Sequence, residues 1–83
     1  MTSREQSARK RVGADFLRAI QANTHPRVTY RMIEERTGID YETVKRLMTN
    51  KTTLTLDYFV DIAEALGADP AETLLAFKKV ISQ

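Results

Sequence analysis

The spacing of apolar residues along the chain predicts short helices rather than strands. The first apolar stripe recurs at intervals of three and four residues, the repeat of one helix face. We expect this helix to run from about Arg4 to Asn23, because the residue before Pro26 avoids the helical region. The residues of the stripe are Val12, Phe16, Leu17 and Ile20.

Four further helices are predicted from signals at their ends. Residues with short polar side chains, which cap helix N-termini, stand before each apolar segment: Thr29, Asp40, Thr55 and Asp69. Gly38 and Gly67 follow two of these segments, where glycine supplies a left-handed C-terminal residue. Pro70 is suited to the first position of the last helix. The expected helices begin at about Thr29, at Tyr41, at Leu56 and at Pro70, and the last reaches Ile81.

Apolar residues recur in each of these four predicted helices. Those of the second and third helices are expected on their inner sides, and in the fifth helix Leu75 and Val80 lie off the stripe that Leu74, Phe77 and Ile81 form. The expected apolar residues are Met32 and Ile33 in the second helix; Val44 and Leu47 in the third; Leu56, Phe59, Val60, Ile62, Ala63 and Leu66 in the fourth; and Leu74, Leu75, Phe77, Val80 and Ile81 in the fifth. No stretch of useful length alternates between apolar and polar residues as a strand does. The chain is therefore predicted to be all-α, a five-helix domain over residues 1–83, because 83 residues are too few for two cores.

Charge is unevenly distributed along this chain. Residues 1–51 hold eleven Lys/Arg and six Asp/Glu, whereas residues 52–83 hold two Lys and five acids. The basic end is a candidate surface for a polyanion, although charges on a small domain also scatter by chance. The chain has no cysteine, which suits a reducing cytosol, and it has no apolar run of the roughly 20 residues that span a bilayer. We expect a cytoplasmic protein without a membrane segment.

Residues 29–49 match the pattern of a helix-turn-helix. Gly38-Ile39-Asp40 is a turn of only three residues, so the two helices must cross steeply. Ile33, Ile39, Val44 and Leu47 fall where such a pair buries its apolar side chains. The outer face of the second of these helices is left polar and partly basic, and a helix of this kind fits the major groove of DNA.

Residues 28–74 resemble the Cro/repressor-type (Xre-like) helix-turn-helix family without a gap. The similarity includes Val28-Thr29, Gly38, the stretch Asp40–Leu47, Asn50-Lys51, Thr55-Leu56-Asp57 and, most closely, Ile62–Asp69. The resemblance implies a lambda-repressor-like fold and a transcriptional regulator that binds double-stranded DNA. It further suggests a Cro-like repressor, of phage or bacterial type, that binds a palindromic operator as a homodimer.

Five positions depart from the family pattern. Tyr30 stands where glutamine is usual, Met48 where an acid is usual, and Leu54 where the loop has proline. Asn50 replaces glycine but can still adopt a left-handed conformation. Glu34 replaces a small alanine, and it crowds the facing helix unless the pair is splayed or the carboxylate finds a partner.

Two sets of candidate DNA contacts follow from the motif. The expected base-reading residues are Tyr41, Glu42, Thr43, Lys45 and Arg46. Arginine and lysine donate to guanine, glutamate accepts from cytosine, and tyrosine packs on the thymine methyl group. The expected phosphate-binding residues are Tyr30, Arg31, Asn50, Lys51, Thr52 and Thr53. The alternatives are that the first set only solvates an exposed helix and that the second is an ordinary polar loop.

Two further segments have open interpretations. Arg4, Arg9, Lys10 and Arg11 form either a basic arm that adds phosphate or minor-groove contacts or a frayed, solvated helix start. Leu75, Val80 and Ile81 are candidates for a dimer contact that sets two recognition helices about 34 Å apart, one DNA turn; alternatively they belong to the core.

The sequence favours a binding protein over an enzyme. It shows no nucleophile triad order, no phosphate-cradling glycine loop and no cluster of metal ligands, and its single histidine, His25, reads as a loop residue. We expect no cofactor and no metal. The competing hypothesis is a protein-interaction module of the same fold, such as an antitoxin, which the apolar fifth helix keeps open.

Overall fold

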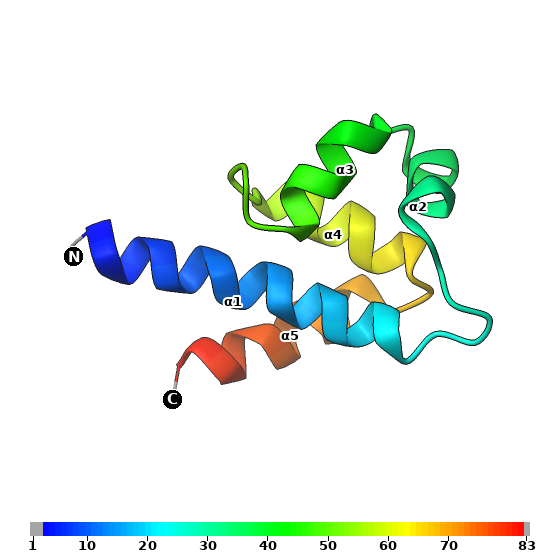
Figure 1. The fold of residues 1–83 in the computed structure, drawn as a ribbon. Coiled ribbons are helices and arrows are strands. Elements are labelled where there is room, and N and C mark those ends of the chain that lie inside the picture. The colour runs from blue at the N-terminus through cyan, green and yellow to red at the C-terminus, as the bar shows by residue number, and fades with distance from the viewer. Residues whose placement is uncertain (1–2, 83) are drawn as a thin grey trace.

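Five helices make up the part of the chain that the computed structural model describes, residues 3–82 for the backbone and 13–82 for the side chains. They are α1 (Ser3–Ala22), α2 (Tyr30–Thr37), α3 (Tyr41–Met48), α4 (Leu56–Ala65) and α5 (Pro70–Ile81), and these residues include no strand. The predicted all-α, five-helix architecture is confirmed. Figure 1 shows α1 running across the molecule, with α2, α3 and α4 on one side of it and α5 on the other.

The predicted caps start four of the helices. Thr29 accepts a hydrogen bond from the Met32 N–H, and Thr55 accepts one from Tyr58 N–H. Asp40 and Asp69 accept in the same way from the N–H groups of Glu42 and Glu72. Each cap satisfies a backbone donor that has no partner inside its own helix. The helix starts were therefore predictable to within one residue.

The core lies where α1, α2, α3 and α4 meet. Its largest fully buried side chains are Leu17, Ile33, Val44, Leu47, Met48 and Ile62. Met48, at the position where the family pattern has an acid, is entirely buried, so it fills core volume. Leu56, the first residue of α4 and one of its expected apolar residues, is in contrast 60% exposed.

A cluster of three phenylalanine rings packs α5 against α1 and α4. Phe77 of α5 lies 5.0 Å from Phe59 of α4 and 5.7 Å from Phe16 of α1, measured between ring centroids. These distances fall in the range in which aromatic pairs attract. Of the apolar stripe predicted for α1, Leu17 is buried, Phe16 and Ile20 are half-buried, and the side chain of Val12 lies outside the described residues.

Three residues turn the chain with a positive φ. Gly38 (φ 79°) ends α2, Gly67 (φ 83°) follows α4, and Asn50 (φ 64°) follows α3. The left-handed conformation predicted at Asn50 is thereby confirmed. Within the described part of the chain, no helix is both long enough and apolar enough to cross a membrane.

Candidate nucleic-acid interface

The helix α3 separates a buried face from an exposed one. Val44, Leu47 and Met48 point into the core and are fully buried. Glu42, Lys45 and Arg46 lie on the opposite side and are exposed. These three positions share one side of the helix because they are spaced three and four residues apart. The core thus fixes which side of α3 faces outward, and that side carries two cations and one anion.

The end of α3 is shaped to hold an exposed polar loop beside this face. The Lys51 N–H donates to the Arg46 carbonyl oxygen (2.8 Å), across the left-handed Asn50. This bond pulls the chain back over the last turn, the usual form of a helix end with a left-handed residue. Lys51, Thr52 and Thr53 follow and are exposed. The loop and the outer face of α3 are therefore neighbours.

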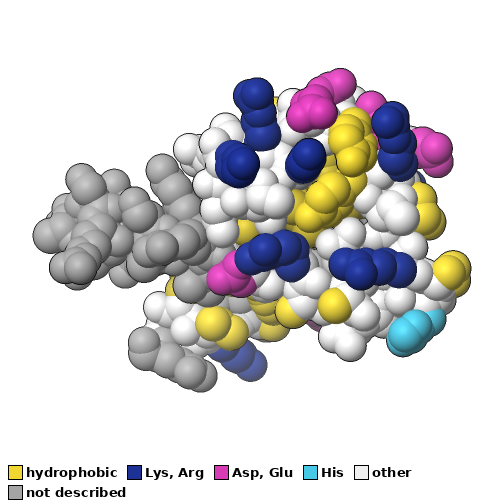
Figure 2. Space-filling view, viewed as in Figure 1, with side chains coloured by type: hydrophobic (Ala, Val, Ile, Leu, Met, Phe, Trp, Pro, Cys, Tyr) yellow, Lys and Arg dark blue, Asp and Glu magenta, His cyan; other side chains and the backbone are white. Residues whose placement is uncertain are grey.

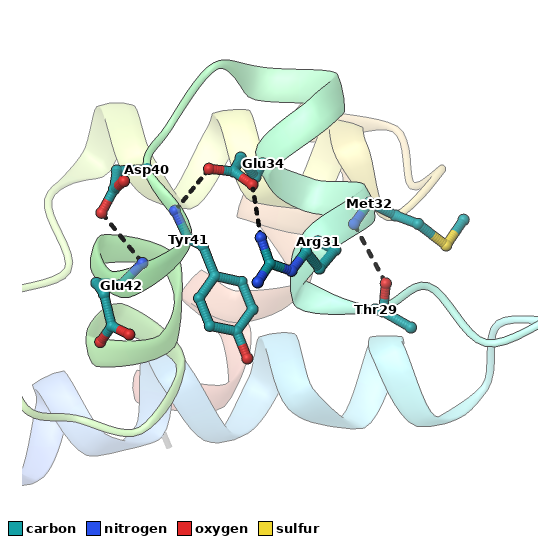
Figure 3. Close-up of polar contacts among 7 residues, drawn as sticks. All are labelled: Thr29, Arg31, Met32, Glu34, Asp40, Tyr41 and Glu42. Atoms are coloured by element: carbon teal, nitrogen blue, oxygen red, sulfur yellow. Dashed lines mark hydrogen bonds and ion pairs between the residues drawn. The ribbon is translucent and has the colours of Figure 1, made fainter.

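The start of α3 is occupied by carboxylates. Asp40 Oδ2 accepts from the Glu42 N–H (3.1 Å), and Glu34 Oε2 accepts from the Tyr41 N–H (3.1 Å). Figure 3 shows both carboxylates at this end, with Glu34 reaching across from α2. Glu34, the residue expected to crowd the facing helix, has the partner it needed. Both anions offset the positive end of the α3 dipole.

The start of α2 differs from the start of α3, since its first turn holds no acid. Arg31 lies in that turn, and its guanidinium carbon sits 4.4 Å from the centroid of the Tyr41 ring, within cation–π range. The rings of Tyr30 and Tyr41 lie 6.5 Å apart. Residues from both predicted contact sets, base-reading and phosphate-binding, therefore meet at Tyr41.

Figure 2 shows lysine and arginine side chains spread over the face that includes α1 and α3, with acidic side chains along its upper edge and also beside one of the cations within it. A strip of side chains coloured as hydrophobic, a group that includes tyrosine, crosses this face from its upper edge toward the middle. One of the cations of α1, Arg18, is paired with Asp15. The predicted base-reading residues all lie on α3. Among them Tyr41 and Thr43 are half-buried, and the other three are exposed.

The remaining candidate residues lie elsewhere or outside the described side chains. Arg4, Arg9, Lys10 and Arg11 belong to α1 by their backbone, but their side chains lie outside the described residues. The dimer candidates are on α5: Leu75 is 57% exposed, Val80 is 50% exposed, and Ile81 is half-buried. Ile81 also lines an apolar groove of about 270 Å³ with residues of α1, α4 and α5, among them Gly13, Leu56, Phe59 and Phe77.

Two contacts between helices illustrate what the sequence did not predict. The Arg31–Tyr41 stack joins residues on different helices, and no short-range pattern predicts such a contact. Arg36 donates through Nη1 to the Ala65 carbonyl oxygen (2.6 Å), which ties α2 to the end of α4. Its position in the last turn of α2 was the only signal, because cations are favoured there.

Among the described residues, no group of three or more His, Cys, Asp or Glu side chains is arranged to hold a metal ion. His25, predicted to be a loop residue, is exposed between α1 and α2. Searches with this chain found no matching protein-family model, no matching curated protein and no matching solved structure.

Proposed function

We propose that this protein is a helix-turn-helix transcriptional regulator that binds double-stranded DNA sequence-specifically, with α3 as the recognition helix. The fold is of the lambda-repressor-like type in this proposal, and the protein acts as a Cro-like repressor on a palindromic operator. The basis is the resemblance of residues 28–74 to the Cro/repressor-type pattern, together with the two-sided character of α3.

The observation that carries the proposal is the outward face of α3. Its exposed Glu42, Lys45 and Arg46 lie opposite three fully buried residues, so the core holds them outward as a rigid set. Arginine and lysine donate to the guanine edge and glutamate accepts from cytosine N4 in the major groove. A rigid helix positions such groups more accurately than a loop does.

Electrostatics favour an asymmetric approach of DNA to α3. Asp40, Glu34 and Glu42 make the first turn of α3 unfavourable for a phosphate. Lys45 and Arg46 in its last turn, and Lys51 beyond it, attract one. In the proposed complex the phosphate contacts come from the Asn50–Thr53 loop and from the acid-free start of α2 with Tyr30 and Arg31.

Selection from a random-sequence pool of duplex DNA tests the proposal directly. The chain offers a matched control, since Lys45-Arg46 and Lys78-Lys79 are both adjacent, exposed cations in the last turn of a helix. We expect the wild-type protein and the Lys78→Ala/Lys79→Ala variant to enrich one inverted repeat. The Lys45→Ala/Arg46→Ala variant should enrich none, because each good base contact contributes about 1–3 kcal/mol of discrimination.

The two double variants change the net charge equally, so non-specific attraction weakens similarly in both. If neither variant changes the enriched sequence, or if the wild-type protein enriches none, α3 does not read bases. A protein that copurifies equally with both variants would then favour the protein-interaction module.

A homodimer through α5 is part of the proposal. Val80 and Leu75 are large apolar side chains left half or more exposed, and Ile81 lines the apolar groove. A two-fold contact would bury these groups and place two recognition helices on successive turns of one DNA face. Sedimentation equilibrium tests this arrangement: the wild-type protein should be dimeric and Val80→Asp monomeric, whereas a monomeric wild-type protein would contradict it.

A further inference from the structure

Glu34 makes two contacts at the junction of α2 and α3. One carboxylate oxygen, Oε2, accepts from the Tyr41 N–H at 3.1 Å, and the other, Oε1, lies 3.8 Å from Nη1 of Arg31. Figure 3 shows this carboxylate between the start of α3 and the Arg31 side chain. The side chain is 34% exposed, so solvent only partly screens it. A single side chain therefore connects α2 to the first residue of α3.

Arg31 is held on a second side by Tyr41. Its guanidinium carbon lies 4.4 Å from the centre of the Tyr41 ring, while the Arg31 side chain remains 72% exposed. A guanidinium carries five N–H donors in a planar fork, and Glu34 faces only one nitrogen of this fork. Arg31 is thus oriented by two groups and still presents free donors to solvent.

We propose that Glu34 is a positioning residue for DNA binding: it fixes the Arg31 guanidinium against Tyr41, so that Arg31 meets a backbone phosphate already oriented. This inference rests on the proposed DNA-binding function and extends it to a residue with no DNA contact of its own. A preorganised arginine loses less conformational freedom when it binds than a free one does. The Glu34 side chain also links the start of α2 to the start of α3. The phosphate contact of Arg31 and the base contacts of α3 are thereby held in a fixed position relative to each other.

The negative charge of Glu34 gives the proposal a distinctive signature. A carboxylate near phosphate weakens binding to every duplex, so its neutralisation alone raises affinity for all sequences alike. If Glu34 also positions Arg31, neutralising Glu34 removes a contribution to the binding free energy that is made only in the complex with the specific duplex. The ratio of affinities for a specific and a scrambled duplex then falls while non-specific affinity rises.

The test compares Glu34→Gln with Glu35→Gln, the adjacent glutamate on the same helix, which is exposed. Both variants remove one negative charge, and the glutamine amide oxygen at position 34 can still accept from Tyr41 N–H. Binding is measured to the duplex selected by the wild-type protein and to a scrambled duplex of equal length. We expect Glu34→Gln to lower the specific-to-scrambled ratio about tenfold, a typical coupling between residues in one network. Glu35→Gln should leave the ratio unchanged.

A double-mutant cycle shows whether Glu34 acts through Arg31. In an Arg31→Ala background, Glu34→Gln should have no further effect on the ratio. Arg31→Lys keeps the positive charge and the Glu34–Tyr41 hydrogen bond but removes the planar fork, and it should lower the ratio as Glu34→Gln does. This variant tests the proposal even if Glu34→Gln unfolds. Equal ratios for Glu34→Gln and Glu35→Gln would overturn the proposal.

A measurement without DNA separates this inference from the proposed function. The NMR order parameter of the Arg31 Nε–H in the free protein should be high in the wild type and in Glu35→Gln, and lower in Glu34→Gln. A mobile Arg31 in the free wild-type protein would overturn the positioning role, whatever the protein binds. An ordered Arg31 in a protein that selects no DNA sequence would instead overturn the DNA function, leaving Glu34 as a helix junction only.

Discussion

At the scale of single residues, backbone conformation was easier to predict than side-chain partnership. The left-handed conformation at Asn50, with a φ of 64°, was expected because Asn50 stands where the family pattern has glycine, and asparagine adopts this conformation more readily than most residues do. The role of Glu34 did not follow from its position. Its ion pair with Arg31 lies within α2, at a spacing of three residues, but its hydrogen bond with the Tyr41 N–H joins α2 to α3 and depends on how the two helices cross.

Substitutions at Asn50 test the left-handed turn. Asn50→Gly should leave the free energy of unfolding almost unchanged, because glycine adopts this φ without steric cost. Asn50→Ala should lower it by about 1 kcal/mol, because the Cβ atom is strained there and the asparagine side chain is lost. Urea unfolding measures both values. An Asn50→Ala variant as stable as the wild type would contradict a left-handed residue 50.

At the scale of helices, the end signals carried most of the information. Each predicted N-cap is observed with its side chain accepting from the backbone N–H two or three residues later. Exposure within a helix does not follow from apolar character alone, as the exposed Leu56 illustrates. Apolar spacing gives the direction of a helix face but not how far the neighbouring helix extends over its first turn.

Substitutions of two aspartates on neighbouring helices distinguish the effect of helix capping on stability from the effect of removing a negative charge. Asp69→Ala removes the cap of α5 and should lower the free energy of unfolding by about 1 kcal/mol. Asp61→Ala, within α4 and exposed, should raise it by about 0.5 kcal/mol, because alanine is the better helix former. Thermal or urea unfolding of the two variants gives the sign of each change. A loss of stability at both positions would show that charge, not capping, accounts for the Asp69 effect.

At the scale of the whole molecule, the packing of the core determines which charged side chains are exposed. Val44, Leu47 and Met48 anchor α3 in the core, and this anchoring leaves Lys45 and Arg46 exposed. Composition alone showed that the first 51 residues are the more basic, but not which cations share a surface. That information depends on the packing of α3 against α1 and α2, which no local pattern specifies.

Met48 tests the anchoring of α3. Met48→Ala should lower the free energy of unfolding by about 2–5 kcal/mol, because it empties a fully buried position. Met48→Leu should cost less than about 1.5 kcal/mol, since the volume is nearly conserved. Glu35→Ala, at an exposed position of α2, is the surface control and should change stability by about 0.5 kcal/mol or less. A Met48→Ala variant no less stable than Glu35→Ala would contradict a buried residue 48.

The orientation of the proposed DNA-binding face can be measured in one NMR titration of the isotope-labelled protein with the selected duplex. We expect the largest amide shift changes in α3, in the Asn50–Thr53 loop and at the start of α2. The amides around Lys78 and Lys79 at the end of α5 should change little, apart from any change in the dimer. Shift changes centred on α4 and α5, with α3 unaffected, would contradict α3 as the recognition helix.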